Sequence, residues 1–182
     1  MNFISTARPF IMDFDSLNYE FNPRFVKSMN FKLIPYDQHN AVNVSIFFRR
    51  IINSMRIIHW VTTVKANGEI WKIYNVTVNG CDIIADQYAK QNTITEAVIK
   101  KIREKVPQLP RKCPFTKDTE FSLINFYLDE EMMPVYLPNI KFETAFNMYT
   151  KNDYLIKIML NAHVESKKGQ RSANGTRNKN GI

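Results

Sequence analysis

The sequence has few of the residues that build metal centres or fibrous repeats. Among its 182 residues are two cysteines, three histidines and five glycines. So few glycines exclude a collagen-like or other low-complexity chain. The histidines, His39, His59 and His163, form no recognisable ligand motif, and two cysteines are too few for a structural zinc site without histidines spaced to help. We therefore expect neither a metal ion nor a cofactor.

Long apolar runs are also missing. No run approaches the roughly 18 residues that a membrane-spanning helix needs, so no transmembrane segment is predicted. Residues 1–12 contain no apolar stretch of the length found in signal peptides, and they are interpreted as an N-terminal extension. Taken alone, this extension favours a cytosolic protein.

The charge is unevenly distributed. The net charge is +8, and half of it lies in residues 165–182, which have no large apolar residue before Ile182. Such a segment cannot bury enough surface to offset the entropy lost on ordering, so it is predicted to be a disordered basic tail. The body, residues 13–164, has no nucleic-acid-binding motif, so a solvated tail is preferred over a nucleic-acid contact. The body is predicted to form a single domain.

Most of the body alternates apolar and polar residues with the period of two that is typical of half-buried strands. The pattern predicts strands near residues 25–33, 42–48, 56–64, 140–148 and 154–164, with another that begins near Phe121. Asn67-Gly68 predicts a hairpin turn, and the returning strand places Tyr74, Val76 and Val78 on one face. Strands joined in this way indicate an antiparallel β-sandwich or cup rather than a parallel α/β sheet.

One segment, about residues 93–106, has the period of a helix and interrupts the strands. Its apolar residues recur at intervals of four, as on one face of an amphipathic helix: Ile94, Val98, Ile102 and Val106. Thr93 and Glu96 fit a capping box at its start. Basic residues occupy the other positions, and they are interpreted as a solvated face rather than a phosphate site: Lys100, Lys101, Arg103 and Lys105.

Cys113 lies in the proline-flanked stretch LPRKCPFTKDTEFSL, residues 109–123. A cysteine in this setting could be a nucleophile, a metal ligand, a structural thiol or half of a disulfide. A nucleophile would need a histidine brought close by the fold, and nothing nearby in the sequence supplies one. The acidic clusters at Asp82 with Asp86 and at residues 129–131 are more typical of solvated loops than of a general acid pair. A protein without enzymatic activity is the prediction.

Three sites fit the N-glycosylation pattern: Asn43, Asn75 and Asn174. Asn43 and Asn75 both fall on the polar phase of their predicted strands, where a glycan could be carried. This placement favours the secretory pathway only mildly, because short motifs also arise by chance.

Several segments in a fixed order resemble a known family. These are YNVTVNGCDII, the amphipathic helix, LPRKCPF, FSLINFYLDEEMMPVYLP and KFETAFNMY. Together they resemble a large insect family of mostly uncharacterised secreted proteins, which is grouped with the CheB chemosensory proteins. That family is distantly similar to the ganglioside activator protein and to ML-type lipid-recognition domains. The chain departs from the family pattern at Asp118, where a glycine is common, and in lacking a visible signal peptide.

The resemblance implies an antiparallel sandwich or cup whose inner faces can enclose an apolar ligand. It also implies that Cys81 and Cys113 form a disulfide, and that the protein is secreted. Candidate cavity residues, taken as the inward phase of their strands, are Phe48, Trp60, Phe142, Phe146 and Ile158.

The expected function is that of a non-enzymatic, monomeric, extracellular binding protein for a hydrophobic small molecule. The ligand would be of the lipid or contact-pheromone class, and the role would be chemosensory. The alternative is an extracellular interaction module with a filled core, which engages a receptor or channel without a ligand.

Overall fold

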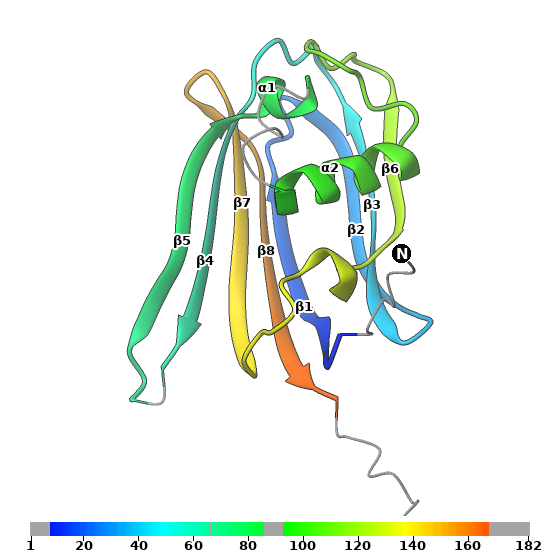
Figure 1. Ribbon diagram of the computed structural model, residues 1–182. Helices are drawn as coiled ribbons and strands as arrows, with labels where there is room; N and C mark the ends of the chain where they lie inside the picture. Colours follow the sequence, from blue (N-terminus) through cyan, green and yellow to red (C-terminus); the bar gives the residue numbers. More distant parts are fainter. Residues whose placement is uncertain (1–7, 66, 86–92, 168–182) are drawn as a thin grey trace, which may run out of the picture.

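The computed structural model describes residues 8–65, 67–85 and 93–167, apart from the side chains of residues 93–97. The chain forms two antiparallel sheets (Figure 1). The larger sheet has the strand order β1 (Phe10–Phe21), β8 (Asp153–Ser166), β7 (Ile140–Thr150), β4 (Arg56–Val64) and β5 (Ile70–Asn79). The smaller sheet has the order β2 (Val26–Tyr36), β3 (His39–Phe48) and β6 (Glu120–Phe126). The predicted fold class, mainly β with antiparallel sheets, is confirmed.

The helical elements lie between β5 and β7. They are α1 (Gly80–Ile84), α2 (Thr93–Lys105) and the short 3-10 helix η2 (Glu130–Met132). The helix predicted at residues 93–106 is α2, which crosses in front of β1 and β2 in Figure 1 and contacts β6. Its predicted capping box, Thr93 and Glu96, falls outside the described side chains. Among the described residues, no helix has the length and apolar character needed to span a bilayer.

Strand β1 was not among the predicted strands. A bulge between Phe14 and Ser16 shifts its pairing with β8, so its core-facing residues change phase along the strand. Phe14 faces the core before the bulge, and Leu17 packs against the same core after it. A search for unbroken alternation misses such a strand.

The pairing of β1 with β8 extends the folded domain beyond its predicted bounds of residues 13–164. The ladder begins where Phe10 pairs with Ser166. The prediction of disorder from residue 165 onward is therefore wrong for Glu165 and Ser166, which are held by backbone pairing in β8. Residues 168–182, the rest of the predicted tail, lie outside the described residues.

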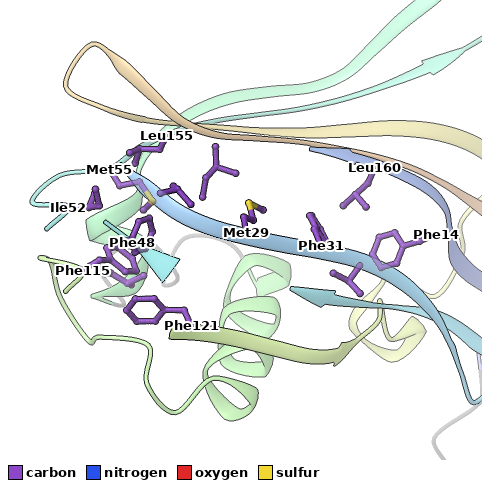
Figure 2. Close-up of a cluster of buried hydrophobic side chains, with 14 of the residues drawn as sticks. Phe14, Met29, Phe31, Phe48, Ile52, Met55, Phe115, Phe121, Leu155 and Leu160 are labelled. Atoms are coloured by element: carbon purple, nitrogen blue, oxygen red, sulfur yellow. The ribbon is translucent and has the colours of Figure 1, made fainter. Parts of the chain in front are cut away.

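The hydrophobic core lies between the sheets, where β1 contacts both β2 and β3 (Figure 2). The rings of Phe48, Phe115 and Phe121 contact one another with centroids 5.7–5.8 Å apart. From β8, Leu155 and Ile156 are completely buried in the same core. Each fully buried side chain of this size stabilises the fold by roughly 1.5–3 kcal/mol.

Lys101 of α2 contacts the segment that follows β6. Its Nζ lies 3.6 Å from a carboxylate oxygen of Asp129 and 3.9 Å from the centroid of the Tyr127 ring. Burial lowers the pKa of Lys101, although the neighbouring Asp129 acts in the opposite direction. The ammonium group thus attaches α2 to the segment that follows β6.

Two more basic residues of α2 attach the helix elsewhere. The guanidinium of Arg103 donates to the carbonyl oxygen of Ile84 in α1, and Lys105 Nζ donates to the carbonyl oxygen of Ile124 in β6 at 3.4 Å. Lys100 remains exposed. The interpretation of the four basic residues as a solvated face is therefore wrong for three of them, because their long side chains reach carbonyl and carboxylate oxygens on neighbouring elements.

A disulfide between Cys81 and Cys113 joins α1 to the loop before β6, with 5.5 Å between the two Cα atoms. Gly80 precedes the first cysteine, and its amide donates to the carbonyl oxygen of Met55 at 2.7 Å. A Cβ atom on residue 80 would lie 3.0 Å from Met55 Cγ and 3.1 Å from Ile57 Cδ1. A larger residue here would therefore have to displace the side chains of Met55 and Ile57 by a few tenths of an ångström.

Asp118 occupies a turn that favours glycine. It has a left-handed backbone with φ of 57°, and its amide donates to the carbonyl oxygen of Phe48 at 3.1 Å. Aspartate tolerates this conformation better than most residues. The turn therefore forms although the expected glycine is replaced.

The predicted β4–β5 hairpin is confirmed, but its loop differs from the expected two-residue turn. The amide of Lys65 donates to the carbonyl oxygen of Glu69, and the amide of Gly68 donates to the carbonyl oxygen of Lys65, both at 2.9 Å. Gly68 adopts φ of 82°. A longer loop with glycine at its left-handed position is a common alternative to the two-residue turn.

Candidate functional site

The register of the large sheet divides its side chains between two faces. Residues paired directly across an antiparallel ladder share a face, and successive residues along a strand alternate. Ile156, Leu160 and Ala162 of β8 are buried in the core, so the β7 residues paired with them also face inward. The same holds for the β4 residues that pair with those β7 residues. The inner face at β4, β5 and β7 carries Ile57, His59, Val61, Thr63, Trp71, Tyr74, Val76, Val78, Phe142, Thr144, Phe146 and Met148.

This register corrects one candidate cavity residue. Trp60 pairs with Ala145 and Asn75, whereas its neighbour His59 pairs with Phe146. Trp60 therefore lies on the outer face, opposite to Phe146, and the prediction that both line one cavity is wrong. The sequence misled because the segment RIIHWVTTV carries apolar residues on both phases.

The other candidates separate into two groups. Phe146 pairs directly with Ile158, and Phe142 lies on the same inner face. Phe48 belongs to the small sheet and is only 3% exposed, because Phe115 and Phe121 pack against its ring. The structure thus pairs Phe146 with Ile158 and places Phe142 on the same face, four residues away along β7, while Phe48 is part of the filled core.

The half of the inner face at β4 and β5 is only partly covered by the described residues. In Figure 1 these two strands lie on the side of the large sheet that is farthest from the small sheet. Tyr74 is 38% exposed and Trp71 is 51% exposed. We call this region, defined by Ile57, His59, Val61, Trp71, Tyr74, Val76 and Phe146, the open inner face.

His59 is the polar centre of the open inner face. Its ring stacks on Phe146 with centroids 4.2 Å apart and planes 7° from parallel, and it meets Tyr74 edge-on at 5.2 Å. Its Nε2 lies 2.9 Å from Oγ1 of Thr144, within hydrogen-bond distance. Burial lowers the pKa of His59 from 6.5 to about 4, because the charged imidazolium loses hydration in this setting. The ring is therefore neutral at pH 7.

The inward position of His59 was not predicted, although the pattern of the returning strand indicates it. The returning strand predicts its own phase clearly, with Tyr74 and Val76 on the apolar side and Asn75 on the polar side. Pairing the two strands would have placed Trp60 with Asn75 on the outside and His59 with Val76 on the inside.

Two shallow hollows lie away from the open inner face. One lies on the outer face of the large sheet, has a volume of about 330 Å³ and is lined by residues that include Trp60, Asn147, Lys157 and Met159. The other lies at the seam between β1 and β2, where Leu17 and Phe31 are among its lining residues. Neither is a sealed cavity between the sheets.

The predicted glycosylation sites differ in accessibility. Asn75 is exposed on the outer face of the edge strand β5. Asn43 lies on the outward side of β3, is half-buried, and its side-chain oxygen accepts a hydrogen bond from the amide of Asn125 at 2.7 Å. Asn174 lies outside the described residues. Use of these sites stays a prediction.

One family model matches the central part of the chain. Residues 55–144 match the family model described as "Protein of unknown function (DUF1091)". The matched segment runs from just before β4 into β7, and it contains both cysteines, His59 and Thr144. The chain matches no curated protein. The grouping with the CheB proteins and the similarity to lipid-recognition domains stay predictions.

Proposed function

We propose that the protein is a non-enzymatic, extracellular binding protein for a hydrophobic small molecule. The observation that carries the proposal is the open inner face. Uncharged and aromatic side chains line this face of the sheet, which is buried at most of its β8 positions but only partly covered by the described residues at β4 and β5. A ligand lying there would extend the core across Trp71 and Tyr74.

The exposed area at these two rings is large enough to matter for binding. Covering the exposed half of Trp71 and the exposed third of Tyr74 would bury on the order of 200 Å², since an aromatic side chain presents about 150–250 Å². At roughly 25 cal/mol per Å², this burial contributes about 5 kcal/mol before the costs of association. Contacts with Val61, Val76 and Phe146 would add to it.

Secretion is supported by the cysteines. Both are consumed in the Cys81–Cys113 disulfide, and no free cysteine is present among the described residues. Structural disulfides persist in oxidising compartments and are rare in the cytosol of mesophilic organisms. The exposed sequon at Asn75 fits the same compartment.

An interaction module is the second candidate, and a different observation favours it. The end of the β4–β5 hairpin exposes Val64, Ile70, Trp71 and Ile73. Exposed apolar side chains on an edge strand are typical of protein contact sites. In this alternative the hairpin contacts a receptor or channel, and the open inner face holds no ligand.

Native mass spectrometry of protein secreted by eukaryotic cells distinguishes the two. The proposal predicts a bound species that is released on denaturation and that is absent from a Phe146→Glu variant, whose buried charge would oppose an apolar ligand. A wild-type protein with the mass of the bare glycosylated chain, and without binding of an added apolar fluorophore, would contradict the proposal and favour the interaction module.

A further inference from the structure

His59 has one polar atom for which the described residues provide no hydrogen-bond partner. Nε2 is paired with Thr144, the ring stacks on Phe146, and it meets Tyr74 in an edge contact. Nδ1, the other ring nitrogen, makes no hydrogen bond to any described residue and is not sealed from solvent by them. One unused hydrogen-bonding atom therefore borders the open inner face.

The chemistry of that atom depends on the tautomer. If Nε2–H donates to Thr144, Nδ1 carries a lone pair and accepts; if the Thr144 hydroxyl donates to Nε2, Nδ1 carries the proton and donates. A hydroxyl group can serve either tautomer, because it both donates and accepts. A carbonyl oxygen serves only one of them.

The surroundings disfavour a charged ligand. The side chains that flank His59 on this face are Ile57, Val61, Val76 and Phe146, all uncharged. The imidazole is itself neutral at pH 7, because burial lowers its pKa to about 4. An ionised carboxylate placed here would lose hydration without gaining an opposite charge, which is costly.

Given the proposed binding function, on which this inference rests, we propose that the ligand is a neutral alcohol. An apolar chain or ring system would cover Trp71 and Tyr74, and its single hydroxyl would hydrogen-bond to Nδ1 of His59. His59 would then be the residue that selects alcohols over fatty acids and hydrocarbons.

The test is displacement of the apolar fluorophore N-phenyl-1-naphthylamine at pH 7.5 by 1-dodecanol, dodecanoate or dodecane. Wild-type protein should prefer dodecanol over both competitors. His59→Phe keeps the stacking with Phe146 but removes Nδ1, so the preference of dodecanol over dodecane should fall roughly three- to tenfold while the fluorophore still binds. Trp60→Phe, one residue away on the outer face, is the matched control and should retain the wild-type preference.

The outcomes separate the inference from the proposed function. Absence of fluorophore binding to wild-type protein would overturn both. Fluorophore binding with equal displacement by dodecanoate, or an unchanged dodecanol preference in His59→Phe, would overturn the alcohol assignment alone. Should His59→Phe fail to fold, the ¹⁵N resonance of His59 Nδ1 in wild-type protein decides: it should shift on addition of dodecanol and not of dodecane, and equal responses would refute the hydrogen bond.

Discussion

Removal of the Cys81–Cys113 disulfide should destabilise the fold by an amount that follows from its position in the chain. The two cysteines are separated by 32 residues. The loop-closure entropy that the crosslink removes from an unfolded chain of this loop length corresponds to about 3.7 kcal/mol at 25 °C. The double variant Cys81→Ser/Cys113→Ser should lose this amount, which is a large fraction of the 5–15 kcal/mol typical of folded domains.

Urea unfolding measures the loss. With a slope near 2 kcal/mol per molar urea, as expected for a domain of this size, the midpoint should fall by roughly 1.5–2 M. Wild-type protein unfolded in the presence of a reductant should behave like the double variant, and the reductant should not affect the double variant itself. Thiol titration should first show that wild-type protein has no free thiol. If the midpoint of the double variant then lies less than about 0.5 M below that of wild type, the crosslink does not constrain the unfolded chain as inferred.

Three further predictions concern the core, α2 and the open inner face. Gly80→Val should lower the free energy of unfolding by about 1–3 kcal/mol in urea titrations, because the new side chain overlaps Met55; an unchanged midpoint would contradict the close approach. Lys101→Ala should lower the free energy of unfolding by about 1–2 kcal/mol, because it removes a half-buried ion pair. Lys100→Ala, on the exposed side of the helix, should change it by no more than about 0.5 kcal/mol. Equal effects of the two substitutions would show that Lys101 is solvated as well. Because the folded-state pKa of His59 is lowered from 6.5 to about 4, the unfolded chain binds more protons between these values, so stability is complete above pH 6.5 and falls as the pH drops toward 4. The free energy of unfolding should fall by roughly 1–2 kcal/mol over this range, after discounting for the solvent contact of the ring. If the free energy of unfolding depends on pH in the same way in wild type and His59→Phe, this prediction is wrong.

The sequence was informative wherever one phase of a strand is apolar and the other polar. Ile156, Leu160 and Val164 of β8 are buried as the alternation predicts, and Phe142 and Phe146 of β7 face inward with them. The helix at residues 93–106 was equally clear, since its apolar residues recur with the period of a helix. These elements follow from local patterning alone.

Patterning failed where it was ambiguous or interrupted. The segment RIIHWVTTV is apolar on both phases, so only its pairing with β5 reveals that His59 faces inward and Trp60 outward. In β1 the bulge after Phe14 changes the phase within the strand. Both features depend on the partner strand, and a single sequence does not specify its register.

Long basic side chains were a second source of error. Composition alone predicts that Lys101, Arg103 and Lys105 are solvated, as such residues usually are. In the folded chain, oxygens of Asp129, Ile84 and Ile124 come within their reach. These partners lie 19 or more residues away along the chain, so no local pattern records the contacts.

The two tryptophans of the chain provide a direct test of where the ligand binds. Trp71 lies on the open inner face and Trp60 on the opposite face of the same sheet. Trp60→Phe leaves Trp71 as the only indole, and Trp71→Phe leaves Trp60, so each variant reports on one face.

The measurement is quenching of this fluorescence by a dodecanol brominated along its chain, since bromine quenches an indole only near contact. We expect saturable quenching of Trp71 in Trp60→Phe, which unbrominated dodecanol reverses, and little quenching of Trp60 in Trp71→Phe. Saturable quenching of Trp60 alone would place the ligand in the outer hollow, and quenching of neither indole would contradict binding to the open inner face.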